Sequence, residues 1–260
     1  MPALRLSVVQ YLNTVPLIWG MLHGKQRGKF ELQLTVPSGC ADALAQRQAD
    51  VGIVPSIEYQ RLDGARILPG MSIASKREVK SVVLLSKMPL AQVQTVALDE
   101  SSRTSAALVR ILMHKFYARR VQFSPAKPEP GEMLKQADAA LLIGDPGLTY
   151  RGPAEVHDLA REWRKFTGLP FVFAVWMGRA DLSAYHADFA ASLAFGLAHI
   201  DDIAAEWGPK LGITPAAVKI YLTQNIDYSL DEENQQGLKL FYQLAHEVGI
   251  TATERELLLA

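Results

Sequence analysis

The stretch Leu4–Pro16 reads LRLSVVQYLNTVP and starts a pattern that recurs along the chain. Leu4–Val9 alternates apolar and polar residues before two valines, which predicts a strand. Tyr11–Pro16 predicts a turn into a helix that runs to about Leu22, because proline fits the first helical turn, where its missing N–H is not needed. A strand followed directly by a helix is the opening half of a strand–helix–strand unit.

The next residues complete this unit. Phe30–Val36 alternates apolar and polar residues as a half-buried strand does, and Ala41–Gln48 is an alanine-rich helix with Ser38 as its expected N-cap. Val51–Val54 predicts a short buried strand, and Pro55–Ser56 opens another helical turn. An order of strand, helix, strand, helix and strand favours a parallel sheet.

A second unit with the same alternation begins near Pro89. Its most distinct element is an amphipathic helix from about Thr104 to Tyr117, whose apolar residues keep helical spacing. From about Ser183 to Leu259 the chain is expected to be helical. The other expected elements are strands at 67–74, 81–85, 95–98, 121–123, 139–143 and 171–176, and a short helix at 132–136.

Two similar α/β units joined by extended strands predict two lobes with a ligand cleft between them. The natural crossings are Leu84–Lys87 and Phe173–Trp176. The second lobe is then an insertion of residues 87–174, and residues 1–86 with 175–260 form the first lobe. Ligands of such sheets bind beyond the carboxyl ends of strands, and clefts between lobes are favoured sites for small molecules.

Composition narrows the class of protein. The 260 residues include 27 Lys and Arg against 27 Asp and Glu, so the formal net charge is zero, which argues against an electrostatic nucleic-acid binder. No apolar run reaches the roughly 18 residues of a membrane span. The N-terminus lacks a signal-peptide layout. The single cysteine, Cys40, excludes an intrachain disulfide. We expect a reduced cytoplasmic protein with neither nucleic acid nor membrane as partner.

Hydroxyl and amide residues follow several predicted strands. The most suggestive segment is 101–105 (SSRTS), which places four hydroxyls and one guanidinium at the start of a helix, where free N–H groups favour an anion. A serine that merely caps the helix would explain the same residues. The candidates of this kind are Asn13, Thr14, Ser38, Ser56, Ser81, Ser101, Ser102, Arg103, Thr104, Ser105, Asp145 and Thr149.

Other catalytic signatures are missing from the sequence. The six histidines show no metal-ligand spacing, and no HExxH, CxxC, GxGxxG or GxxxxGK[ST] motif occurs, so neither a metal nor a nucleotide cofactor is expected. Phe166, Phe171, Phe173 and Trp176 form either an aromatic pocket wall or part of the core. These residues indicate a cleft for a small anionic ligand and leave open whether the protein is an enzyme or a binding protein.

Several blocks of the chain occur in the order of a known family. They are Tyr11–Leu17, Asp50–Glu58, Val79–Val82, Asp99–Ser105, Leu142–Asp145 and Trp163–Ala174. Together they resemble the chorismate dehydratase family of the futalosine route to menaquinone. A sister enzyme, 1,4-dihydroxy-6-naphthoate synthase, shares the fold but typically begins with a Ser-Pro-Cys-Pro-Asn-Asp-like loop. This chain has Tyr-Leu-Asn-Thr-Val-Pro there, which favours the dehydratase.

The resemblance implies a type II periplasmic-binding-protein fold used as a cytoplasmic enzyme. It implies elimination of water from the dicarboxylate chorismate, with Asn13 and Ser81 as the catalytic residues. The base is expected to be the substrate's own enolpyruvyl carboxylate, with Glu58 as the alternative. A non-catalytic small-anion binding or sensing protein and a homodimer through the helical tail both remain open. Substrate contacts are expected from Thr14, Ser38, Ser56, Ser101, Ser102, Arg103, Thr104, Ser105, Asp145 and Phe171.

Overall fold

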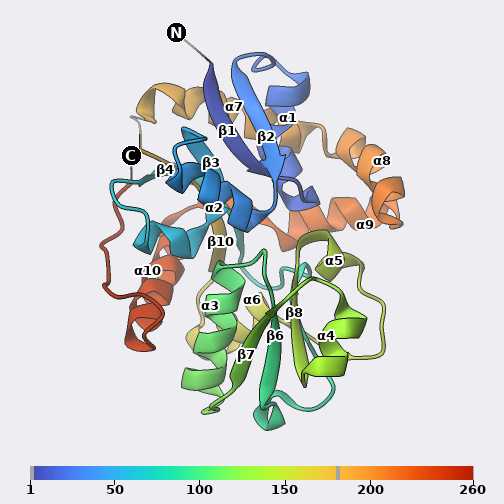
Figure 1. The fold of residues 1–260 in the computed structure, drawn as a ribbon. Helices are drawn as coiled ribbons and strands as arrows, with labels where there is room; N and C mark the ends of the chain where they lie inside the picture. The colour runs from blue at the N-terminus through green and yellow to red at the C-terminus, as the bar shows by residue number, and fades with distance from the viewer. Residues whose placement is uncertain (1–2, 180–181, 260) are drawn as a thin grey trace.

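The computed structural model describes residues 3–179 and 182–259. The chain forms two lobes, each built around its own β-sheet, one above the other in Figure 1. The first sheet has the order β11-β4-β10-β3-β1-β2, and the second has the order β7-β6-β8-β5-β9. The two-lobed α/β architecture that the sequence predicts is therefore confirmed.

The first lobe opens with the predicted parallel strands. β1 (Leu4–Val9) lies between β2 (Phe30–Thr35) and β3 (Val51–Pro55), and every residue of β3 is buried. The helix α1 (Val15–His23) follows β1 through a single turn at 12–14, and it has proline in its first turn as expected. Parallel neighbours joined through helices bring the carboxyl ends of β1 and β3 to the same edge.

The helix α2 (Pro37–Ala45) begins earlier than predicted. Its N-cap position is Val36, and Pro37 takes the first helical position, so Ser38 lies inside the first turn and does not cap the helix. Proline at that position is already set to the helical φ, and this preference outweighs the capping preference of the serine one residue later.

The remainder of the first sheet is antiparallel. β10 (Phe171–Gly178) pairs with β3 and β4 (Arg66–Ser75), and β11 (Asp227–Leu230) pairs with β4. The prediction of a parallel sheet thus holds only for β1, β2 and β3. The prediction of a wholly helical tail is also wrong at β11, because a four-residue strand between helices carries too little periodicity to stand out.

The second lobe repeats the plan. β6 (Thr95–Asp99) lies between its parallel neighbours β7 (Gln122–Ala126) and β8 (Ala139–Ile143), and β5 (Val82–Ser86) pairs antiparallel with β8 and β9 (Glu155–Asp158). The sequence did not predict β9 or two of the helices. The helices of this lobe are α3 (Thr104–Ile111) with a π-helical turn (Leu112–Phe116), α4 (Pro130–Gln136), α5 (Gly144–Thr149) and α6 (Leu159–Thr167).

The crossings between the lobes differ from those predicted. The chain changes sheets between Ser75 and Val82, and again between Thr167 and Phe171. Leu84–Lys87 and Phe173–Trp176, the expected crossings, instead belong mostly to β5 and β10. Both strands are almost entirely buried, and an apolar run does not indicate which sheet it will join.

Helices of the C-terminal region brace both lobes. α7 (His186–Ala198) packs on α1, whereas α10 (Glu232–Glu247) contacts β10 of the first lobe and α3 of the second. Between them lie α8 (Ile200–Leu211), α9 (Pro215–Ile220) and a π-helical turn (Tyr221–Asn225). Within the described residues, no helix is both long and apolar enough to cross a membrane.

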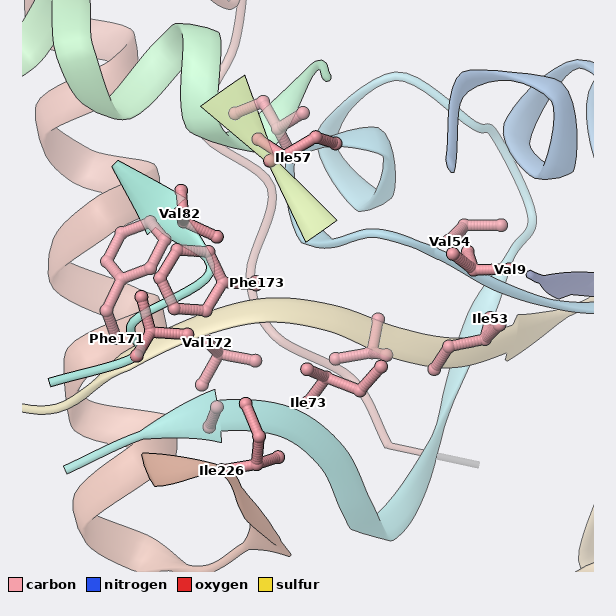
Figure 2. Close-up of a cluster of buried hydrophobic side chains, with 14 of the residues drawn as sticks. Val9, Ile53, Val54, Ile57, Ile73, Val82, Phe171, Val172, Phe173 and Ile226 are labelled. Carbon is pink, nitrogen blue, oxygen red and sulfur yellow. The ribbon is translucent and has the colours of Figure 1, made fainter. Parts of the chain in front are cut away.

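The main hydrophobic core runs through both lobes along β10. Figure 2 shows Phe171 and Phe173 of β10 side by side near Val82, whereas Val9 of β1 and Ile53 of β3 lie further along the length of β10. The ring centroids of Phe171 and Phe173 lie 4.8 Å apart. This shared core holds the two sheets next to each other, so the edges that carry the strand ends face one another.

Candidate active site

A cavity with about 450 Å³ of empty space, its open mouth included, lies between the lobes, where strand ends from both sheets meet. The carboxyl ends of β1, β3 and β8 and the start of α3 form its walls, which is where the sequence predicts a ligand. Most of the lining is apolar. The lining residues are Val9, Tyr11, Asn13, Pro37, Pro55, Ile73, Val82, Ser102, Arg103, Thr104, Ser105, Ile143, Gly144, Phe173 and Ala174.

Hydrogen bonds across the cavity hold the lobes in a closed arrangement. The Leu12 N–H of the first lobe donates to Asp145 Oδ1 of the second at 3.0 Å. The Ile57 N–H donates to Thr104 Oγ1 at 3.1 Å. The Ser38 N–H donates to the Ser101 carbonyl oxygen at 3.0 Å. The three donors are backbone groups of separate helical segments of the first lobe, so the two lobes are joined at several points.

The start of α3 offers free hydrogen-bond donors to the cavity. The hydroxyls of Ser102 and Ser105 have no protein hydrogen-bond partner among residues 3–179 and 182–259. The first N–H groups of a helix also lack intrahelical partners. The Ser101 hydroxyl, by contrast, donates to Asp99 Oδ1 at 2.6 Å. This wall can therefore hold a carboxylate through hydroxyls and backbone amides.

Arg103 links the lobes through ion pairs. Its guanidinium donates to Asp42 Oδ1 at 2.7 Å and to Glu58 Oε2 at 3.1 Å. Glu58 is only 3% exposed and also accepts from Arg61 at 2.8 Å. The Glu58 carboxylate is thus held between two arginines and lies outside the cavity lining, so its geometry does not suit a general base.

The opposite wall carries Tyr11 and Asn13. The ring of Tyr11 packs against Gly144, where a Cβ atom would lie 2.4 Å from the ring Cδ2. Gly144 also has a φ of +62°, which favours glycine. Asn13 is held by its neighbours: the Thr14 hydroxyl donates to Asn13 Oδ1 at 3.3 Å, and the Tyr228 hydroxyl donates to the Asn13 carbonyl at 2.9 Å.

Ser81 lies directly behind the cavity wall, next to the lining residue Val82. It is fully buried, and its Oγ accepts from the Tyr221 hydroxyl at 2.7 Å. Burial raises the pKa of Tyr221, and hydrogen bonding to Ser81 and Asn13 opposes that shift. Tyr221 therefore lies beside the two residues that the family resemblance assigns to catalysis, and at neutral pH its hydroxyl carries its proton.

The loop before Ser81 is fixed by a buried carboxylate. Asp158 accepts from the Val79 N–H at 3.2 Å and from the Lys80 N–H at 2.7 Å, and it also caps α6. Lys80 has a φ of +63°, an unusual conformation for a residue with a side chain. Such backbone strain is held in place by its surroundings, and here it sets the position of Ser81.

The sequence-predicted residues separate into two groups. Phe171 packs in the core against Trp163 and Phe241, and its neighbour on the same strand face, Phe173, lines the cavity instead. Five predicted residues line the cavity, namely Asn13, Ser102, Arg103, Thr104 and Ser105. The structure places the others around it or in the core, namely Thr14, Ser38, Ser56, Ser81, Ser101, Asp145 and Phe171.

Sequence reasoning missed three residues of this region. Tyr11 and Gly144 follow the ends of predicted strands, so their position was a usable signal. Tyr221 comes from the C-terminal helices, and no pattern in the sequence links it to Ser81. It begins a π-helical turn, a feature that often marks functional sites but that only a structure reveals.

Two other chemical groups bear on what the site can do. Burial raises the pKa of Asp145 to about 6, and the hydrogen bond from Leu12 opposes this shift. Cys40 is fully buried, and burial raises its pKa to about 11, so it is not an activated nucleophile. Among the described residues, no group of three or more His, Cys, Asp or Glu side chains is arranged to hold a metal ion.

The two lobes with a cavity between them have the architecture of the periplasmic-binding-protein fold. A solved protein of Archaeoglobus fulgidus shares 19% identity and superimposes with a TM-score of 0.76, covering 95% of this chain and 98% of that one. The periplasmic aliphatic sulphonate binding protein of Escherichia coli shares 15% identity with a TM-score of 0.69, covering 99% of this chain and 91% of that one.

Residues 4–247 match the family described as menaquinone biosynthesis, and the chain belongs to that family. The chorismate dehydratase of Thermus thermophilus is 31% identical over 264 residues, covering 91% of this chain and 93% of that protein. The chorismate dehydratase of Campylobacter jejuni is 28% identical over 177 residues, covering 64% of this chain and 63% of that protein.

Proposed function

We propose that this chain eliminates water from chorismate to give 3-[(1-carboxyvinyl)oxy]benzoate, as a step of menaquinone biosynthesis by the futalosine route. The observation that carries the proposal is the largely apolar cavity between the lobes, where hydroxyl and N–H groups at the start of α3 have no partner among the described residues. The 31% identity to a chorismate dehydratase supports the choice of substrate. A cytoplasmic location belongs to the same proposal, because a biosynthetic enzyme acts where its substrate is made.

The reaction itself sets modest demands on the protein. The ring loses its hydroxyl group as hydroxide and a proton from the carbon that carries the enolpyruvyl ether. The base that takes the proton passes it to the hydroxide, which gives water and restores the base. The cyclohexadiene ring becomes aromatic, so the elimination is strongly favourable. The site must hold two carboxylates, assist the departing hydroxide and provide an acceptor for the proton.

The lining of the cavity supports the substrate's own carboxylate as the base. Among the described lining residues there is no carboxylate, imidazole or thiol, and Glu58 is held by Arg61 and Arg103. The enolpyruvyl carboxylate, held against the ring, takes the proton within the same molecule. Well-aligned intramolecular reactions of this kind reach effective molarities of about 10⁵ M or more.

The departing oxygen is stabilised from the wall that carries Asn13. The Asn13 amide donates a hydrogen bond to it, and Ser81 supplies a second donor once the wall adjusts to substrate. Because Tyr221 donates to Ser81 Oγ, it polarises the serine hydroxyl and makes it a stronger donor. Donors placed in a cavity that excludes water stabilise developing negative charge more strongly than solvent does.

The other wall anchors the substrate. A substrate carboxylate accepts from the Ser102 and Ser105 hydroxyls and from the free N–H groups at the start of α3. Arg103 lies in the same wall, with its charge paired to Asp42 and Glu58. The contacts made by this wall are equal in the ground state and the transition state. They therefore contribute to affinity more than to the rate of the chemical step.

Incubation of the purified, metal-stripped protein with chorismate tests the proposal. We expect an aromatic product whose mass is that of chorismate less one water. Intact chorismate together with tight binding by calorimetry would instead favour a small-anion binding protein of the same fold. An amide replacing the enolpyruvyl carboxylate should bind without eliminating, and normal turnover of that analogue would refute the intramolecular base.

A further inference from the structure

A second, open cavity, with about 960 Å³ of empty space including its mouth, lies where α3 ends beside α10 and shares no described lining residue with the interlobe cavity. Figure 1 shows these two helices. Both lobes contribute to it. The first lobe supplies Arg61, which follows the turn Ser56–Gln60, and residues 248–250 after α10. The second lobe supplies Arg110 and His114 with Arg119, Arg120, Val121 and Phe123.

The lining of this cavity is cationic. Its described lining residues include four arginines and one histidine but no aspartate or glutamate. Arg61 is neutralised by Glu58, and Glu247 at the end of α10 pairs with Lys115. Across the described part of the chain, Arg110, Arg119 and Arg120 have no carboxylate within ion-pair distance. Three guanidinium charges are therefore gathered in one hollow without compensation.

Two of these arginines are partly withdrawn from water. Arg119 Nε is shielded from solvent and has no hydrogen-bond partner in the described structure. The Arg110 guanidinium lies over the Phe123 ring at 4.3 Å from its centroid. Leaving a shielded N–H unpaired is costly, so an acceptor supplied from outside the chain would be bound favourably.

We propose that this cavity is a binding site for a ligand that carries a dianionic phosphate group. The planar guanidinium presents paired N–H donors that match phosphate oxygens. The apolar side chains of Val121, Phe123 and Ile250 form a floor against which the organic part of the ligand packs.

Stabilisation of the end of α3 is an alternative explanation for the cationic residues of this cavity, and it accounts for only some of them. Cations in the last turn of a helix interact favourably with its dipole, and this accounts for Arg110 and His114. The π-helical turn ends at Phe116, so Arg119 and Arg120 lie beyond the helix. The convergence of these two arginines on the same hollow as Arg61 from the other lobe requires a further reason, which a bound anion supplies.

Titration calorimetry with pyrophosphate at low ionic strength tests the proposal, with inorganic phosphate and succinate as companion probes. We expect pyrophosphate to bind most tightly and succinate weakly, with an affinity that falls as salt is raised. Arg119→Gln and Arg120→Gln should each weaken pyrophosphate binding about tenfold, and the double variant should abolish it. Arg120 is exposed, so its substitution leaves the fold intact.

Arg27→Gln is the matched control, because Arg27 is an exposed arginine outside this cavity. Its pyrophosphate affinity should equal that of the wild type, and turnover of chorismate should be unchanged in all these variants. Absence of pyrophosphate binding by the wild type would overturn the proposal. So would equal binding of succinate, or binding that survives in the double variant, since the anion would then lie elsewhere.

Discussion

The two lobes share one strand order but differ in the turn that faces the cavity. In the first lobe β1 lies between β2 and β3, and in the second β6 lies between β7 and β8. Each sheet continues with an antiparallel strand that enters from the other lobe, β10 in the first and β5 in the second. β1 and β6 therefore occupy equivalent positions, and the turns that follow them meet across the cavity.

These equivalent turns carry different chemistry. The turn after β1 presents the Tyr11 ring and the Asn13 amide, whereas the turn after β6 presents Ser102 and Ser105 at a helix start. Under the proposed function, one scaffold supplies both a wall that anchors an anion and a wall that touches the reacting ring. In this proposal, the separation of substrate anchoring from the chemical step depends on a few residues in two turns. Substitutions in each turn therefore test the two functions separately.

The largest expected effect is on the reacting wall. Asn13→Ala removes the amide donor, and we expect kcat to fall about 100- to 1,000-fold with little change in KM, because the lost interaction forms only in the transition state. Steady-state assays of chorismate loss measure both constants. A rise in KM at constant kcat would show that Asn13 binds the substrate and has no part in the chemical step, so the two walls would not differ in function.

Tyr221→Phe should have the next largest effect. It leaves Ser81 without the donor that polarises it, so kcat should fall about tenfold at unchanged KM. Ser81→Ala should act through the same path, so the double variant should be no slower than the more affected single variant. A double-variant cycle measures this, and additive losses would show that the two hydroxyls act independently.

Gly144→Ala tests the contact between the walls. A Cβ atom would collide with the Tyr11 ring, so closure should be impaired and KM should rise about tenfold. Gly168→Ala is the control, because Gly168 has a φ of +73° but no atom within 4 Å of an added Cβ. Both variants should lose about 1 kcal/mol of stability from backbone strain. An equal rise in KM in both would rule out the collision.

Substitutions in the anchoring wall should change KM and leave kcat unchanged. Ser102→Ala removes one hydrogen bond to a substrate carboxylate, and we expect KM to rise about fivefold at unchanged kcat, as for the loss of about 1 kcal/mol. Ser38→Ala, at a residue outside the lining, should leave KM unchanged. A lower kcat for Ser102→Ala would place this serine in the chemical step.

The last prediction concerns stability and has no expected effect on kcat: Asp145 joins the walls by accepting from the Leu12 N–H. Its pKa is raised from 3.8 to about 6, so burial of the charged form destabilises the fold increasingly as pH rises through that interval. Asp145→Asn should raise stability by about 1–2 kcal/mol at about pH 7 and have little effect near pH 4. Thermal unfolding at both pH values measures this, and equal effects would refute burial of the charge as its cause.

Local patterns in the sequence were sufficient for much of the fold. The strands β1, β3, β6 and β8 have the predicted positions, because alternation, proline and burial are encoded within a few residues. The helix start at 101–105 that the sequence singled out contributes four residues to the cavity lining, and its binding of an anion stays a prediction. The crossings were misplaced because an apolar strand can join either sheet, and β11 was missed because it is too short to show a period.

The sequence by itself determined the two α/β units, the polar turns at their strand ends and the family resemblance. Only the tertiary structure decided that Tyr221 meets Ser81, that Glu58 is held by two arginines, and that Phe173 lines the cavity while Phe171 is core. The physical reason is the separation in sequence between the residues that interact. Secondary structure follows from neighbours in the chain, whereas these contacts join segments far apart in sequence through the packing of two sheets and the helices that cover them.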